Sequence, residues 1–153
     1  MNKCFENLVA EFCMAVNLPC PKEMMNGVAF TINHVTFSVH HQRKAKNDLL
    51  FIYADFGRAP KKNARTCYYH LLQENFLDFP VKDASFGVVS ATRNVVHVSS
   101  YCLDTITADD LVETVVGLAW QAELWRIDNL SGDRNTAPGV AANRAGFMTF
   151  SAH

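Results

Sequence analysis

One segment in the middle of the chain, Asp48 to Phe56, restricts the fold more than any other. Its residues are apolar on both sides of a strand: Leu50, Ile52, Ala54 and Phe56 on one face, and Leu49, Phe51 and Tyr53 on the other. A strand with two apolar faces belongs in the interior of a sheet, where both faces are covered. We therefore expect Asp48 to Phe56 to be the central strand of a sheet.

The segments around it alternate between apolar and polar residues, as strands with one buried face do. Before it, Val28, Phe30 and Ile32 and then Val35, Phe37 and Val39 predict two strands that turn near Asn33 and His34, followed by a polar loop from His41 to Asn47. After it, Ala84 to Ser90 and Val95 to Leu103 predict two more strands, joined by a short polar connection at 91–94.

Three segments have the 3.6-residue period of a helix. In residues 2–17 the apolar stripe is Phe5, Leu8, Val9, Phe12 and Val16, and Pro19 and Pro21 are expected to end the helix. Ala64 to Phe76 predicts a second helix. A third helix begins after Thr107, a favourable N-cap with Asp110 three residues on, and extends to about Asn129.

This order predicts an α+β fold: a mostly antiparallel, twisted sheet of about five strands with three helices, in the order α-β-β-β-α-β-β-α. The pattern covers residues 1–128 as one domain. Residues 129–153 are rich in Gly, Ala, Asn and Arg and carry an apolar cluster of Phe147, Met148 and Phe150. We expect them to form a flexible C-terminal tail.

Charge and composition exclude several classes of protein. The formal net charge is −1, from 14 basic and 15 acidic residues, which argues against nucleic-acid binding. No apolar stretch is long enough to insert into a membrane, and the N-terminus lacks the pattern of a signal peptide, so we expect a cytoplasmic protein. Five cysteines, an odd number without a C-x-x-C pair, indicate buried free thiols in a reducing compartment: Cys4, Cys13, Cys20, Cys67 and Cys102.

Two clusters of basic residues lie in predicted loops: Arg43, Lys44 and Lys46, and then Arg58, Lys61, Lys62 and Arg65. Neither cluster contains the aromatic residues that stack on nucleic-acid bases. We interpret both as solvated loops. Steering of an acidic stretch in a partner is the alternative.

The sequence contains none of the common catalytic motifs. Adjacent His40 and His41 would point to opposite faces of a strand, so they would not chelate a metal together. Cys67 and His70 are neighbours on a helix but lack an orienting group, and His97 lies within a strand. Asp109 and Asp110 complement a helix dipole. We therefore expect no enzyme activity, no metal and no cofactor.

The chain resembles the CesT/Tir-chaperone family, the chaperones of bacterial type III secretion systems. Three segments carry the resemblance: Leu71-Leu72-Gln73-Glu74-Asn75-Phe76 at the end of the second helix, the strand Ala84 to Ser90 with Gly87, and Leu111 to Arg126, which ends in Gln121-Ala122-Glu123-Leu124-Trp125-Arg126. The resemblance covers residues 1 to about 128, and it rests on element order and local sequence, since the family has no catalytic signature.

The resemblance implies a cytoplasmic homodimer that binds the N-terminal region of a secreted effector and keeps it extended for export. The secretion-system ATPase is a further partner that it suggests. On this basis we expect the dimer interface on the second helix and the following strand, at Tyr68, Tyr69, Leu72, Phe76 and Val89.

For the effector we expect contacts from the first helix and the first hairpin, at Phe5, Val9, Phe30, Ile32, Phe37 and Val39. The alternative for each of these residues is an ordinary place in the core. At the level of function, two alternatives to a secretion chaperone are a regulatory protein-binding module of similar fold, such as an anti-activator or a YbjN-like domain, and a small enzyme with a polar pocket.

Overall fold

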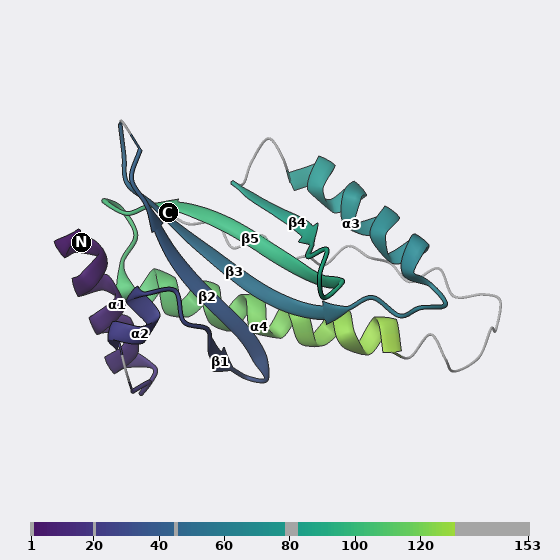
Figure 1. Ribbon diagram of the computed structural model, residues 1–153, viewed down its shortest axis with the longest axis horizontal. Coiled ribbons are helices and arrows are strands. Elements are labelled where there is room, and N and C mark those ends of the chain that lie inside the picture. Colours follow the sequence, from purple (N-terminus) through teal and green to yellow (C-terminus); the bar gives the residue numbers. More distant parts are fainter. Residues whose placement is uncertain (1, 20, 45, 79–82, 131–153) are drawn as a thin grey trace.

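Four helices and five strands make up the computed structural model, which describes residues 2–19, 21–44, 46–78 and 83–130 (Figure 1). In chain order these are α1 (Lys3–Ala15), α2 (Pro21–Met25), β1 (Phe30–Ile32), β2 (Val35–Gln42), β3 (Leu49–Arg58), α3 (Ala64–Asp78), β4 (Ala84–Val88), β5 (Asn94–Cys102) and α4 (Ala108–Leu130). The predicted α+β class and strand order are confirmed. The helix α2 is an addition to the prediction.

The start of α2 explains why it was missed. We expected Pro21 only to end a helix, but it is the first residue of α2. Proline fits the first helical position because its fixed φ suits a helix and the amide hydrogen it lacks has no partner there. A helix of five residues is too short to show a period in the sequence. Met24 of α2 is buried and lies against the thiol of Cys13 in α1.

The five strands form one antiparallel sheet in the order β1-β2-β3-β5-β4. Asp48 to Phe56 therefore predicted the central strand correctly. Asn33 and His34, which join β1 to β2, have φ values of 47° and 62°. Two successive positive φ values are the mark of a type I′ turn, which suits the twist of a two-residue hairpin. The short strands β1 and β4 are the two edges of the sheet.

The core lies on one face of this sheet, between the strands and the helices α1 and α4. Alternate residues of β2 and β3 are buried there, among them Val35, Phe37, Val39, Leu50, Ile52, Ala54 and Phe56. On the opposite face of β3, Leu49, Phe51 and Tyr53 are only half-buried. We expected both faces of the central strand to be covered. In a single copy, only one face is fully covered.

Arg126 of α4 holds the first hairpin against the rest of the fold. Its guanidinium donates hydrogen bonds to three backbone carbonyls: those of Phe56 (3.0 Å), Asp55 (2.9 Å) and His34 (2.9 Å). Hydrogen bonds from a charged donor are stronger than those between neutral groups. This one side chain therefore ties the β1–β2 turn and the end of β3 to the last helix.

Helix α4 continues to Leu130, two residues past the expected domain boundary at 128. The rest of the expected tail, with Phe147, Met148 and Phe150, lies outside the described residues, and so does Cys20. Within the described ranges, no helix combines the length and the apolar character that a membrane span needs.

Candidate partner-binding surfaces

The polar residues singled out in the sequence have structural partners. His41 forms a hydrogen bond of 2.9 Å with the carboxylate of Asp48 and stacks on Phe5. Hydrogen bonds from Asn2 and His41 lower the pKa of Asp48. The ring of His40 lies against Tyr53 on the other face of β2, which confirms that the two histidines diverge. In the described part of the chain, no three His, Cys, Asp or Glu side chains are grouped in a way that could hold a metal ion.

The other candidates are structural as well. The thiol of Cys67 is buried, burial raises its pKa, and its sulfur lies 2.7 Å from the side-chain oxygen of Asn129. A thiol with a raised pKa is a poor nucleophile at neutral pH. His97 packs against Phe56 and Phe86. The Thr107 hydroxyl accepts a hydrogen bond from the backbone N–H of Asp110 (3.2 Å), and the Asp110 carboxylate accepts one from the backbone N–H of Thr107 (2.9 Å), so the predicted capping box is confirmed.

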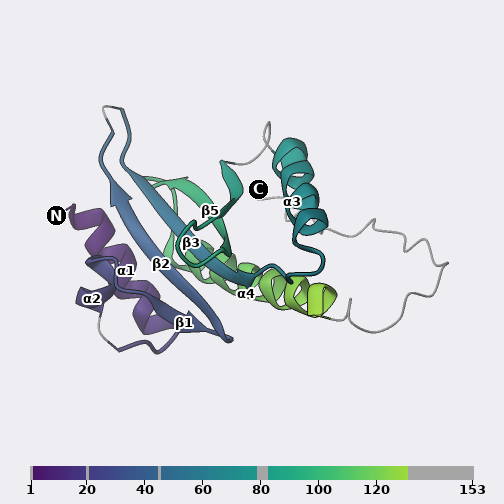
Figure 2. The ribbon, with the colours of Figure 1, turned by 45° about the vertical axis from the view of Figure 1, so that its right-hand side comes forward.

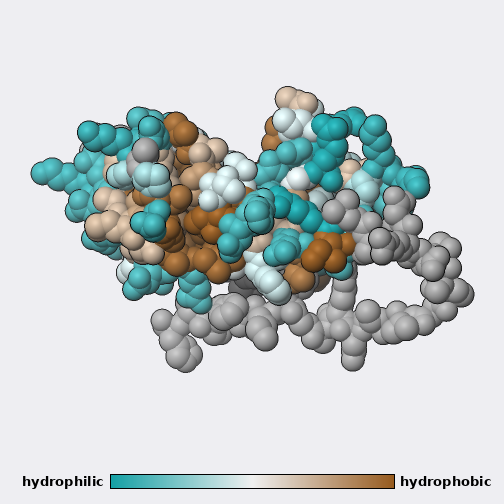
Figure 3. Space-filling view, turned by 90° about the horizontal axis from the view of Figure 1, so that it is seen from below, coloured by the Kyte–Doolittle hydropathy of each residue, from teal (hydrophilic) through white to brown (hydrophobic). Residues whose placement is uncertain are grey.

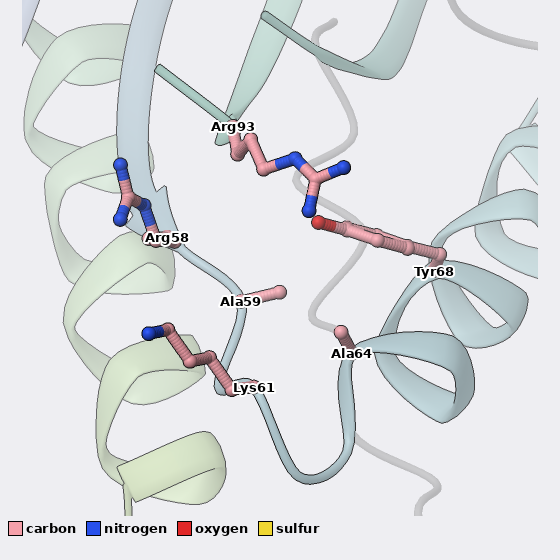
Figure 4. A pocket seen from close by; sticks show the side chains of 6 residues that line it. All are labelled: Arg58, Ala59, Lys61, Ala64, Tyr68 and Arg93. Atoms are coloured by element: carbon pink, nitrogen blue, oxygen red, sulfur yellow. The ribbon is translucent and has the colours of Figure 1, made fainter. Parts of the chain in front are cut away.

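A pocket of about 300 Å³ lies where the loop before α3 meets the β4–β5 hairpin (Figure 4). Arg58, Lys61 and Arg93 line it together with Tyr68. Figure 4 shows that Arg93 reaches toward the Tyr68 hydroxyl, whereas the side chains of Arg58 and Lys61 point to the opposite side. Arg58 also donates two hydrogen bonds to the carbonyl of Thr92. The cationic groups do not converge on one point, so this pocket is not a built anion site.

The residues expected to bind an effector fall into two groups. Phe5, Val9, Phe37 and Val39 are buried in the core of a single copy. Phe30 and Ile32 of β1 are half-buried and lie at the margin of the core, where the ring of Phe30 contacts those of Phe12 and Phe37. Only β1 therefore presents apolar side chains from the predicted set to a partner.

The free edge of β1 is suited to accept a strand. Ile32 pairs with Val35 across the two-residue turn, Thr31 with Thr36, and Phe30 with Phe37. Hydrogen-bonded and non-hydrogen-bonded pairs alternate in an antiparallel ladder, and the pair that closes such a turn is hydrogen-bonded. The peptide groups of Thr31 therefore point away from β2. In the described ranges no strand lies on that side of β1.

The residues of the predicted dimer interface lie on α3 and directly after β4. Tyr69, Leu72, Phe76 and Val89 are exposed, and Tyr68 is half-buried. Figure 2 shows α3 standing beside β4 at the end of the sheet, away from the helices α1 and α2. A groove of about 250 Å³ runs between the two elements and is lined by Tyr68, Leu71, Leu72, Asn75, Phe86, Gly87 and Val88. Large exposed apolar surfaces of this kind mark interaction sites.

The edge of β4, unlike that of β1, is blocked by a side chain. The amide of Asn75 on α3 accepts a hydrogen bond from the backbone N–H of Phe86 (2.6 Å) and donates one to its carbonyl (2.9 Å). An adjacent strand would make the same two hydrogen bonds. Asn75 thereby protects an edge that would otherwise pair with another chain. The sequence gives no local signal for this contact, because the two residues meet only in the folded chain.

We predict that Asn75→Leu removes this protection. Loss of the two hydrogen bonds leaves the peptide groups of Phe86 unpaired, and the free energy of unfolding should fall by about 1–3 kcal/mol. The variant should also form soluble oligomers through the exposed edge, which size-exclusion chromatography with light scattering measures. Gln73→Leu, an equally conservative change on the exposed side of α3, is the control and should do neither. Identical elution and stability for Asn75→Leu would show that Asn75 does not guard this edge.

Sequence reasoning overlooked a second apolar stripe, on the solvent side of α4. Val116, Trp120, Leu124 and Ile127 are exposed, and their spacing places them on one side of the helix. The opposite side carries the buried residues Leu111, Val115, Leu118, Ala119 and Ala122. Figure 3 shows apolar side chains gathered on the underside of the molecule, along which α4 runs in Figure 1. The spacing was visible in the sequence, but α4 was interpreted only through its buried stripe.

Comparisons with known proteins give a family model and several solved structures. The model described as the Tir chaperone protein (CesT) family matches residues 7–126. No curated protein sequence matches the chain. The ExsC–ExsE complex has a TM-score of 0.62 and 19% identity and covers 79% of this chain and 90% of that one.

Two further structures share this fold. The Yersinia pestis type III secretion chaperone SycH, in complex with a stable fragment of YscM2, has a TM-score of 0.59 and 16% identity, with 79% of this chain and 98% of that one covered. The HopA1–SchA chaperone–effector complex has a TM-score of 0.60 and 13% identity, with 80% and 93% covered.

Proposed function

The chain belongs to the Tir chaperone protein (CesT) family, and on this basis we propose that it is a type III secretion chaperone that binds the N-terminal region of a secreted effector in the cytoplasm. Its work is binding and not catalysis. The observation that carries the proposal is the open edge of β1, flanked by the half-buried side chains of Phe30 and Ile32. The chaperone complexes among the structural neighbours support a polypeptide as the partner.

Strand addition at β1 meets the physical requirement of such a client. Ordering an extended backbone costs about 1–2 kcal/mol per residue, so the chaperone must offer many contacts in return. Backbone hydrogen bonds to Thr31 hold a client of any sequence, and alternate client side chains reach the apolar margin at Phe30 and Ile32. Val28, just before β1, is exposed and extends this margin. We accordingly move the client site from the buried residues of the expected set to this edge.

A homodimer through the α3–β4 surface would double the number of client sites. This surface is separate from β1, because β1 and β4 are the opposite edges of the sheet. Its exposed residues include aromatic side chains, Tyr69 and Phe76, which are enriched in protein interfaces. The client would then bind at the free edge β1, and the partner copy would lie at the opposite end of the sheet, where Asn75 covers the edge of β4.

Thr31→Pro tests the client site without disturbing the hairpin. Proline removes the one N–H that points away from β2, and it is tolerated on a free edge. The variant should fold with unchanged thermal stability but bind the client at least about tenfold more weakly, since it loses a backbone hydrogen bond and gains a clash. Thr31→Val, which keeps the N–H, is the matched control. Equal affinity of both variants would exclude strand addition at β1.

The client itself is found by capture from the source bacterium with secretion blocked, followed by mass spectrometry. The proposal expects a protein whose N-terminal segment alone binds the chaperone and whose export fails when the chaperone is deleted. A captured transcription regulator with no exported client would instead support the regulatory alternative.

A further inference from the structure

Cationic side chains gather at one end of the sheet, where β3 ends and the β4–β5 turn lies. Hydrogen bonds hold these parts together: Arg58 donates to the carbonyl of Thr92, and Arg126 of α4 donates to that of Phe56. We call this part of the molecule the basic end, and it consists of residues 55–65, 91–94 and 126–130. Its charged residues are six cations and two carboxylates: Arg58, Lys61, Lys62, Arg65, Arg93, Arg126, Asp55 and Asp128.

The basic end differs in charge from the rest of the chain. Its net charge is +4 while that of the whole chain is −1, so the remaining residues carry −5. Lys61, Arg65 and Arg93 are exposed, and within the described ranges none of the three has an ion-pair partner. Positive charge concentrated on one part of an otherwise acidic protein attracts anionic groups to that part. The basic end is therefore suited to an acidic partner.

The spacing of these cations fits several carboxylates along a polypeptide better than one small anion. Figure 4 shows Ala59 and Ala64 between Lys61 on one side and Arg93 with Tyr68 on the other. The cations thus flank a pocket of about 300 Å³ and do not converge in it. An acidic side chain in the pocket meets Arg93 and the Tyr68 hydroxyl, while its neighbours along the chain meet Lys61.

We infer that the basic end binds an acidic stretch of the same client whose strand pairs with β1, so this inference rests on the proposed function. The turn after β1 lies at this end of the sheet, because Arg126 donates to the carbonyls of both His34 and Phe56. A strand added to β1 lies three strand spacings from β3, or about 15 Å. About five extended residues span this distance. The acidic stretch therefore begins about five residues from the paired strand.

Fluorescein-labelled peptides test this inference. Each has a strand-forming half of alternating Val and Thr, a linker of about five Ser residues, and a run of Glu or, in the second peptide, an equal run of Gln. The run is placed at either end of the strand half, so that both strand directions are sampled. Fluorescence anisotropy at low salt should show the Glu peptide binding about tenfold more tightly than the Gln peptide. Added salt should reduce this preference, because it screens exposed charges.

Charge reversal locates the site. The double variant Lys61→Glu, Arg93→Glu should abolish the preference for the Glu peptide. The matched control is Lys44→Glu, Lys46→Glu, which changes the net charge by the same amount in the β2–β3 connection, at the opposite end of the sheet (Figure 1). This control should keep most of the preference. All four side chains are exposed, so both variants should retain the parent circular dichroism spectrum.

Three results would overturn the inference. The first is equal affinity of the parent chain for the two peptides. The second is an equal loss of preference in both double variants, because the attraction is then to net charge alone. The third is tighter binding of a single-stranded oligonucleotide of the same charge, which would assign the basic end to nucleic acid. Thr31→Pro keeps the proposed function separate: if it leaves both peptide affinities unchanged, strand addition at β1 fails, whereas a retained preference for Glu still supports the basic end.

Discussion

A Phe37→Glu variant is expected to be unfolded at room temperature. Phe37 is 1% exposed, pairs with Ala54 in the centre of the sheet and stacks on Phe30 with ring centroids 5.7 Å apart. Truncation of a buried phenylalanine to alanine costs about 3–5 kcal/mol. Glutamate adds the cost of burying a carboxyl group without a partner, several kcal/mol more. The total is comparable to the whole free energy of unfolding of a domain, about 5–15 kcal/mol.

Circular dichroism and thermal denaturation of Phe37→Glu test this expectation. The control is Ser38→Glu, which places the same side chain one residue along, on the half-open face of β2, and should shift the melting temperature by only a few degrees. A folded Phe37→Glu protein that melts cooperatively near the parent would remove Phe37 from the core. It would also restore this residue as a candidate for direct contact with a client.

Phe37 shows what the sequence could and could not predict about the client site. The alternation Val35, Phe37, Val39 correctly shows that the three side chains share one face of a strand. It does not show whether that face meets the molecule's own helices or a partner. Phe30 and Phe37 have the same pattern, yet Phe30 is half-buried because it lies on the edge strand while Phe37 lies one strand further in.

Features that depend on adjacent residues were predicted, whereas contacts between residues distant in the sequence were missed. The turn near Asn33 and His34, the capping box at Thr107 and the central position of β3 each depend on a few adjacent residues, and all three were predicted. The type I′ geometry of the turn was not predicted. The Asn75–Phe86 contact and the Arg126 clamp join residues distant in the sequence, and no pattern indicates them. The surface of α3 was assigned through the family resemblance, since the period of α3 alone does not distinguish its exposed face.

A Leu72→Asp, Phe76→Asp double variant is expected to turn a micromolar homodimer into a monomer of 17.1 kDa. The two side chains are 65% and 80% exposed in a single copy and, four positions apart, lie on the same side of α3. Burial of each in an interface contributes about 1.5–3 kcal/mol. Both copies carry the two substitutions, so four such side chains are lost and the dimer should be weakened by at least about four orders of magnitude in Kd. Both side chains point to solvent in one copy, so the monomer should keep its circular dichroism spectrum and melt cooperatively.

Leu77→Asp provides the matched control, because Leu77 is 68% exposed on the same helix. It follows Phe76 directly and is turned about 100° around the helix axis from it, so an interface centred on Leu72 and Phe76 leaves it at the margin. Light scattering over a range of concentrations separates the outcomes. A Leu77→Asp protein that dissociates as readily as the double variant would place the centre of the interface elsewhere on α3. A parent chain that already scatters as a monomer at micromolar concentration would exclude the dimer, and the α3–β4 groove would then be open to a client.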